Sequence, residues 1–284
     1  LHLVQQVLLI CGWLYLQMFD RKRRGMWRRR IWLLFSIVFF SQLFLGIFVD
    51  SMFLMSGKLH FPIPGLIPAG VFYRGEVSFM PFLFLVTILL SGGAWCSQLC
   101  YFGAWDSLAA GKNGKREALS SKMRTRMRWT VLFVFIGVAS ALRGFGIPVI
   151  YSTGIAAFAG IVGIMIIGFM SKRCHVAIHC SSYCPAGTLV MYLKQVSPWR
   201  LRLNDRCRHC MACTRVCRYG ALSKVDVLKG RPAINCTLCG DCLAGCRHDA
   251  LEYHLGGISP VLAERLWLGT TLVLFTCFLS IARV

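Results

Sequence analysis

Six long apolar segments constrain this chain more than any other feature of its sequence. A helix needs roughly 20 mostly apolar residues to cross the hydrocarbon core of a membrane. Only 15% of the 284 residues are charged, whereas soluble domains carry about 25%. The sequence therefore predicts a membrane protein built mainly of α-helices. The apolar segments are residues 1–19, 31–49, 78–95, 129–148, 152–170 and 266–281.

The positions of the basic residues predict how the chain lies in the membrane. Residues 20–30, 106–128 and 171–257 hold 27 of the 32 Lys and Arg residues. An excess of Lys and Arg marks the cytoplasmic side, and six spans place all three stretches on that side. Topology therefore explains the net charge of +21. We expect no nucleic-acid partner, because no base-reading motif accompanies the charge.

Two cysteine runs between the fifth and sixth apolar segments have the spacing C-x2-C-x2-C-x3-C. This spacing holds iron–sulfur clusters in bacterial two-cluster ferredoxins, where the fourth cysteine of each run ligates the other cluster. The runs therefore predict two [4Fe-4S] clusters. The predicted ligands are Cys207, Cys210, Cys213 and Cys246 for the first cluster, and Cys236, Cys239, Cys242 and Cys217 for the second.

Other uses of these eight cysteines fit the sequence less well. Disulfides need an oxidising compartment, and zinc sites use pairs of C-x2-C rather than two complete runs. Covalent c-type haem is excluded, because no C-x-x-C-H occurs. In ferredoxins proline usually follows the last cysteine of each run, but here Arg218 and Arg247 follow it. We expect their positive charge to raise the cluster potentials.

Two further cysteine pairs have the spacing C-x3-C, and each is followed by a glycine three residues later. A spacing of four places two thiols on one face of a helical turn. Both pairs follow spans that run inward, so we expect them at the cytoplasmic surface. They are interpreted either as a four-thiolate site for a third cluster or another metal, or as dithiol switches, or as inert buried thiols. The pairs are Cys96 with Cys100 and Cys180 with Cys184.

The remaining cysteines and the histidines have simpler interpretations. Cys174, His175 and His179 crowd the second C-x3-C pair and offer alternative ligands. Cys11 and Cys277 lie alone in apolar segments, where cysteine behaves as a small hydrophobic residue. No histidine falls in the middle of a predicted span, so we expect no transmembrane b-haem relay within this chain.

The segments WCSQLCYFGAW and CSSYCPAG, followed by the two ferredoxin runs, resemble the membrane polyferredoxins of the NapH/NosR/CcoG type. These are 4Fe-4S quinol-dehydrogenase membrane components of bacterial nitrate, nitrous oxide and cytochrome-oxidase systems. The resemblance covers residues 31–251. It implies a bacterial inner-membrane protein that exchanges electrons with the quinone pool and acts with partner subunits. The first C-x3-C pair departs from the family pattern, because Tyr101 stands where the family has proline.

Three residues are candidates for a quinone site on the outer side of the membrane. Ionisable residues inside a membrane are costly and are usually functional. Arg143 lies near the outer end of the fourth predicted span, Asp50 follows the second span, and His60 lies in the next loop. The alternative for Arg143 is an interfacial side chain that extends outward to water.

The sequence thus predicts a polytopic helical bundle of about six spans with an inserted cytoplasmic two-cluster ferredoxin domain. The predicted divisions are a membrane domain at 1–199, the ferredoxin domain at 200–257 and a last span at 258–284. The basic surface of the inserted domain is suited either to an acidic redox partner protein or to anionic membrane lipid.

The leading functional hypothesis is an electron-transfer subunit of a respiratory complex, which passes electrons between the quinone pool and partner redox subunits. A second hypothesis is a maturation factor that reduces a metal such as copper for another enzyme. A third is a redox-sensing membrane regulator. The group bound by the C-x3-C pairs distinguishes them, because a third cluster favours electron transfer, whereas copper or a labile disulfide favours maturation.

Overall fold

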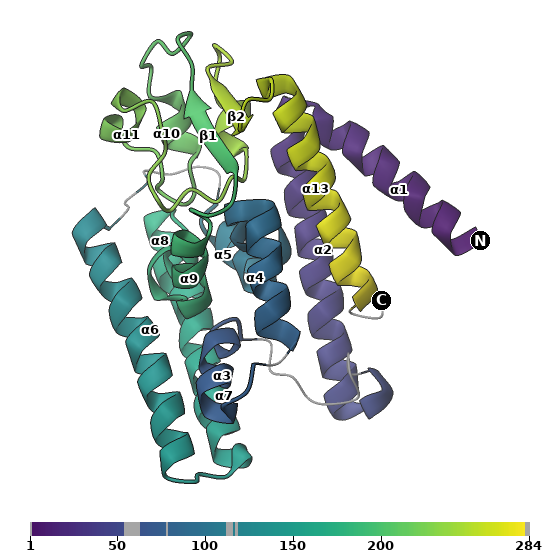
Figure 1. The fold of residues 1–284 in the computed structure, drawn as a ribbon, viewed down its shortest axis with the longest axis vertical. Helices are drawn as coiled ribbons and strands as arrows, with labels where there is room; N and C mark the ends of the chain where they lie inside the picture. The colour runs from purple at the N-terminus through teal and green to yellow at the C-terminus, as the bar shows by residue number, and fades with distance from the viewer. Residues whose placement is uncertain (1, 54–62, 78, 112–115, 117–118, 282–284) are drawn as a thin grey trace.

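The computed structural model describes residues 2–53, 63–77, 79–111, 116 and 119–281, and it is mainly helical. Long helices form an elongated body, and two strands with several short helices form a cap at one end of it (Figure 1). The long helices are α1 (His2–Phe19), α2 (Arg21–Phe48), α4 (Phe79–Ser91), α6 (Ser121–Gly144), α7 (Val149–Met165) and α13 (Pro260–Ile281).

Four stretches of helix are long and apolar enough to cross a membrane. Large apolar side chains on them, such as Phe133 and Phe158, face outward and are more than half exposed. A helix with an apolar outer surface suits a lipid environment rather than water. These findings indicate a membrane protein, and four of the six predicted spans correspond to these stretches. They are Arg21–Phe48, Phe79–Leu99, Ser121–Gly144 and Val149–Cys174.

The first and sixth predicted spans lie in α1 and α13. The described apolar part of α1, Leu9–Phe19, is shorter than a membrane span. The first two turns of α13 include Glu264 and Arg265, and this helix is not among the four stretches that meet the length and composition of a span. A total of six spans therefore remains a prediction.

The cap contains both ferredoxin-type cysteine runs, which lie between its two strands. The strands pair antiparallel, with Trp199 opposite Leu255 and Leu203 opposite Leu251. Tyr253 of the second strand stacks on Trp267 of α13 with ring centroids 4.5 Å apart, so the last helix is packed directly against the cap. The cap elements are β1 (Trp199–Leu203), α10 (Ala212–Val216), α11 (Lys224–Leu228), α12 (Asp241–Ala244) and β2 (Leu251–Leu255).

Short helical elements connect the long helices, and most of them lie near the cap. Three of them, η3, η4 and η5, are π-helical turns, which are wider than α-helical ones. They are η1 (Ser51–Phe53), α3 (Leu66–Arg74), η2 (Gly92–Ala94), η3 (Trp95–Leu99), α5 (Tyr101–Ala109), η4 (Ile166–Ser171), α8 (Lys172–Cys174), η5 (His179–Tyr183) and α9 (Pro185–Leu193).

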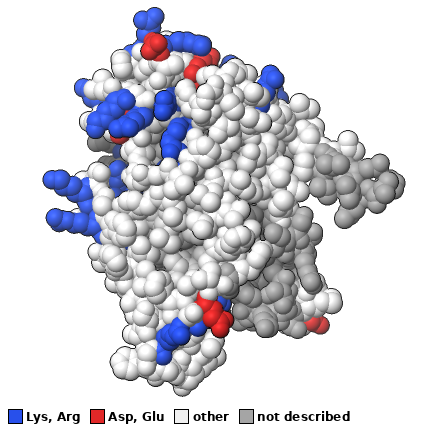
Figure 2. Space-filling model, in the orientation of Figure 1, with Lys and Arg blue, Asp and Glu red and all other residues white. Residues whose placement is uncertain are grey.

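The basic side chains are distributed unevenly over the molecule. Figure 2 shows Lys and Arg gathered on and just below the cap, with one small mixed group of charges near the opposite end. The surface between these ends is largely uncharged in this view. Such a distribution suits a chain whose middle lies in lipid. The assignment of the cap to the cytoplasm remains a prediction.

Candidate metal centres

The first set of predicted ligands lines one cavity of the cap. The loop before α10 bends around this cavity, because His209 and Met211 adopt left-handed backbone conformations with φ of 49° and 58°. Cys210 is exposed to solvent, so this cavity lies close to the surface of the cap. The four cysteines are Cys207, Cys210, Cys213 and Cys246.

The second set of predicted ligands is more deeply buried. Burial, together with the negative charge of Cys236, raises the pKa of the Cys217 thiol to about 11. Burial also raises the pKa of Cys242, and charges on Cys239, Cys236 and Cys217 add to this effect. These four thiols therefore lie close together. In both sets the fourth cysteine of one run lies with the first three of the other.

The chemistry of these two sets fits iron–sulfur clusters. A buried thiolate is costly without a positive partner, as the raised pKa values of Cys217 and Cys242 show. Ligation to iron removes the thiol proton and compensates the charge. Main-chain donors also face the sulfur atoms: Ala221 N lies 3.2 Å from Cys217 Sγ, and Ala250 N lies 3.3 Å from Cys246 Sγ. Such donors tune the potential of a cluster.

The two C-x3-C pairs, 84 positions apart in sequence, converge on a second cavity. This cavity lies where α4 and α7 approach the cap, between η3 and η5. All four cysteines are less than a tenth exposed, so they are shielded from solvent, and their place on the cytoplasmic side of the membrane stays a prediction. The cap covers them. The four cysteines are Cys96, Cys100, Cys180 and Cys184.

The two pairs share one local structure. In each, the first cysteine lies in a π-helical turn, and the second is extended, with φ and ψ of −83° and 118° at Cys100 and −73° and 120° at Cys184. The main-chain N–H groups of Cys100 and Cys184 donate to the carbonyls of Trp95 and His179, each over 2.9 Å. Each second cysteine also begins a nine-residue helix. The turn is therefore π-helical rather than α-helical, and both thiols of each pair line the same cavity.

The glycine that follows each pair has a steric reason. A Cβ atom on Gly103 would lie 2.4 Å from the carbonyl oxygen of Cys96, and one on Gly187 would lie 2.9 Å from that of Cys180. Only glycine lets the start of α5 or α9 pack directly on the carbonyl of the first cysteine. The repeated C-x3-C-x-x-G pattern thus specifies a repeated backbone arrangement.

A buried arginine supports each pair. Arg28 Nη1 donates to the Ser97 carbonyl over 2.6 Å, and Arg128 Nε donates to the Ser181 carbonyl over 2.6 Å. Both arginines are at most 3% exposed. In the sequence alone, both arginines indicate only the topology of the membrane spans. The sequence did hold one clue to this role, because an arginine stands just before an apolar segment upstream of each pair.

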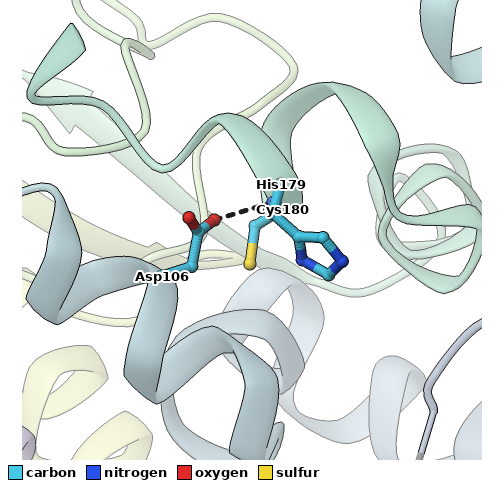
Figure 3. A group of neighbouring side chains, drawn as sticks. All are labelled: Asp106, His179 and Cys180. Atoms are coloured by element: carbon cyan, nitrogen blue, oxygen red, sulfur yellow. Dashed lines mark hydrogen bonds between the residues drawn. The ribbon is translucent and has the colours of Figure 1, made fainter. Parts of the chain in front are cut away.

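Asp106, His179 and Cys180 form a compact group beside the cavity of the C-x3-C pairs (Figure 3), with ligand atoms within 4.8 Å of one another. The Asp106 carboxylate accepts the main-chain N–H of Cys180 over 2.8 Å. Burial raises the pKa of Asp106 to about 6 and lowers that of His179 to about 4. The hydrogen bond from Cys180 to the Asp106 carboxylate holds η5 in place. Cys174 and His175, the other candidate ligands, do not line the cavity.

Ion pairs fix the cap on the start of α2. Asp241, which precedes a ferredoxin-type cysteine, lies 3.2 Å from Arg28, 3.3 Å from Arg29 and 3.8 Å from Arg218. Burial alone would raise the pKa of Asp241, but these guanidinium groups lower it overall. Glu264 of α13 pairs with two more arginines of α2, Arg21 and Arg24.

No hydrogen bond or ion pair joins Arg143 to Asp50, the two predicted quinone residues in the described parts of the chain. Arg143 lies near the end of α6, and its guanidinium packs against Gly75, which ends α3. Asp50 follows α2 and accepts the main-chain N–H of Met52 over 2.7 Å. His60 lies outside the described residues.

One comparison with known proteins gives a match. A sequence family described as a 4Fe-4S binding domain matches residues 75–117, a segment whose only cysteines are Cys96 and Cys100. Neither curated proteins nor solved structures gave a match. The family match, together with the cysteine-rich cavities, supports an iron–sulfur protein. The more specific resemblance to the NapH/NosR/CcoG type remains a prediction.

Proposed function

We propose that this protein is a membrane-bound iron–sulfur electron-transfer subunit of a respiratory complex. It exchanges electrons between the quinone pool and partner redox subunits. The observation that supports the proposal is the crossed grouping of the ferredoxin-type cysteines at the end of an apolar helical body. Cys207, Cys210, Cys213 and Cys246 hold the first [4Fe-4S] cluster, and Cys236, Cys239, Cys242 and Cys217 hold the second.

The proposed architecture has six spans, with the cap on the cytoplasmic side of a bacterial inner membrane. The membrane domain is residues 1–199, the ferredoxin domain is 200–257 and the last span lies in 258–284. The unequal distribution of basic side chains supports this orientation, because Lys and Arg favour the cytoplasmic side. The stacking of Tyr253 on Trp267 supports treating the cap and the last helix as one packed unit.

The exposed face of the first cavity is the proposed contact for a redox partner. Arg208 and His248 line this cavity, and both are exposed, as is Cys210. An acidic partner would be attracted to such a surface and would bring its own redox centre close to the first cluster. The deeper second set is less accessible from solvent, because three of its four cysteines are buried.

For the quinone, we propose a site at the end of the body opposite the cap, with Arg143 as the residue to test first and with Asp50 and His60 as further candidates. Arg143 is the basic residue in the last turn of α6. Replacement of Arg143 by leucine is expected to lower quinol-linked reduction of the clusters while the protein keeps its iron. Unchanged quinol-linked reduction in Arg143→Leu would remove Arg143 from the proposal.

The test of the proposed function uses the full chain, purified in detergent without oxygen. Addition of a reduced quinol is expected to produce the low-temperature EPR signals of reduced [4Fe-4S] clusters. Iron, acid-labile sulfide and copper are measured per chain on the same sample. Clusters that ignore quinol and respond only to a soluble donor, in a protein that also contains copper, would instead indicate a metal-maturation factor.

A further inference from the structure

We propose that Cys96, Cys100, Cys180 and Cys184 hold a third [4Fe-4S] cluster, which lies beneath the cap and exchanges electrons with the cluster on Cys217, Cys236, Cys239 and Cys242. The exchange rests on the proposed function above. The binding of the third cluster does not, because it is measured by composition rather than by activity.

The convergence of four thiols on one cavity supports a cluster there. Two segments of the chain, each with a C-x3-C pair, bring all four thiols to the wall of one cavity. Like the cavity of the first ferredoxin-type set, this cavity is lined by four cysteines. The matched 4Fe-4S binding family covers one of the two pairs, but half of a ligand set cannot hold a cubane. The structure supplies the other half from residues 180–184.

The spacing of the four thiols does not fit one metal ion bound by all of them. Zinc–thiolate bonds of about 2.3 Å in a tetrahedron place the sulfur atoms about 3.8 Å apart. In the described part of the chain, the only group of three or more ligand atoms within 4.8 Å of one another is Asp106, His179 and Cys180. No three of the four thiols are that close. A cubane spreads its ligands further, because each thiolate binds a different iron.

Positive charge near the two pairs also favours an anionic cluster. A cluster with four thiolate ligands is an anion, so a buried site needs compensating positive charge. Arg28 and Arg128 bring guanidinium groups to symmetrical positions, one at the main chain of each pair, and Arg28 also pairs with Asp241. The N-termini of α5 and α9 add the positive ends of two helix dipoles. In the second of them, Gly187 N lies 3.4 Å from Cys184 Sγ.

The repeated order of elements around the cavity also favours a four-ligand site. Each half of the site consists of a long helix with a buried arginine, an apolar helix, a π-helical turn with the first cysteine, and a nine-residue helix that begins at the second cysteine. Inert thiols would not require the same arrangement twice around one cavity. Two equivalent halves that each give two ligands make a complete four-ligand site.

Contacts with the cap join the third site to the second ferredoxin-type set. Tyr219 is 1% exposed and packs between Cys180 and Cys239. Its hydroxyl donates to the Cys96 carbonyl over 3.5 Å. Ser97 Oγ donates to the Thr237 carbonyl over 2.9 Å. The exchange across this contact is one electron from the reduced cluster of the cap to the oxidised cluster below it, or the reverse, and no proton or bond is transferred.

The experiment measures composition and spin count in the full chain, reconstituted anaerobically with ferrous iron and sulfide. Three cubanes give about 12 iron and 12 sulfide per chain, and two give about 8. Mössbauer spectra of the wild-type protein are expected to show only cluster iron, and full reduction is expected to give three cluster spins. Cys100→Ser is expected to lose about a third of the iron. The control Cys174→Ser, whose thiol lies outside the cavity, is expected to keep all of it.

Each other outcome has a definite meaning. Wild-type protein with about 8 iron and two spins overturns the third cluster and leaves the proposed function intact. The same holds if about 8 iron are accompanied by one zinc or one copper per chain. A chain that binds iron neither at the ferredoxin-type cysteines nor at the C-x3-C pairs overturns both proposals. The wild-type measurements decide the question even if Cys100→Ser does not fold.

Discussion

Replacement of Gly103 by alanine tests most directly how the chain builds the site between the C-x3-C pairs. The new Cβ atom would lie 2.4 Å from the carbonyl oxygen of Cys96 and 2.7 Å from a ring carbon of Trp32, whereas ordinary contacts are 3.4–4 Å. Neither neighbour can yield easily, because one is main chain and the other is a fully buried ring whose N–H donates to the Cys100 carbonyl over 2.8 Å. The first cysteine must therefore move by about 1 Å or α5 must tilt.

The magnitude follows from two opposing terms. Alanine is favoured over glycine in a helix by up to about 1 kcal/mol, while overpacking of a buried site costs about 1–3 kcal/mol. The free energy of unfolding is therefore expected to fall by roughly 1–2 kcal/mol. Displacement of Cys96 is also expected to cost the site its bound iron. The control is Gly137→Ala in α6, where a Cβ meets no atom within 4 Å and only the favourable helix term applies.

The assay compares the midpoint of thermal unfolding in detergent and the iron content of the two variants with those of the wild-type protein. Gly103→Ala is expected to unfold at a lower temperature and to lose about a third of its iron, whereas Gly137→Ala keeps its iron and is at least as stable as the wild type. If Gly103→Ala behaved like Gly137→Ala in both measurements, the close packing of α5 on Cys96 would be refuted.

Three further substitutions test the contacts around this site. Gly93→Ala places a Cβ atom 2.8 Å from the Cys236 carbonyl, so we expect the cap to loosen, measured as faster proteolysis; an unchanged rate would contradict this. Asp106→Ala leaves the buried N–H of Cys180 without its acceptor, at a cost of about 1–3 kcal/mol, and is expected to lose iron that Asp106→Asn retains. Tyr219→Leu removes the ring between two cysteine sets and is expected to slow electron exchange between their clusters, measured by rapid-freeze EPR. Tyr219→Phe serves as its control, and equal rates in both variants and the wild type would remove Tyr219 from the path.

Much of the arrangement of thiols could be predicted from spacing alone. The C-x2-C-x2-C-x3-C runs predicted that each fourth cysteine lies with the opposite run, and in the structure Cys217 and Cys246 lie in this way. The apolar segments predicted the helices of the body, and four stretches have the length and composition of a span. Spacing works here because a short loop can bring its own residues together in only a few ways.

The local structure of the C-x3-C pairs could not be predicted in the same way. A spacing of four fits an α-helical turn as well as a π-helical one, and the two differ by a single main-chain hydrogen bond to Trp95 or His179. The glycine three residues after each pair carried the missing information. Its meaning depends on how closely the next helix approaches a carbonyl, which only the folded structure shows.

The buried arginines show a more general limit. Arg28 and Arg128 stand beside apolar segments, where membrane topology already explains basic residues, so their positions in the sequence indicate no further role. Asp241, the partner of Arg28, lies 213 residues further along the chain. A buried arginine without its carboxylate would cost about 3–5 kcal/mol, so burial of Arg28 depends on docking of the cap. The same side chain donates to the Ser97 carbonyl beside Cys96. Docking of the cap therefore helps to fix the first C-x3-C pair, and the proposed third cluster should form only in a chain whose cap has folded onto α2.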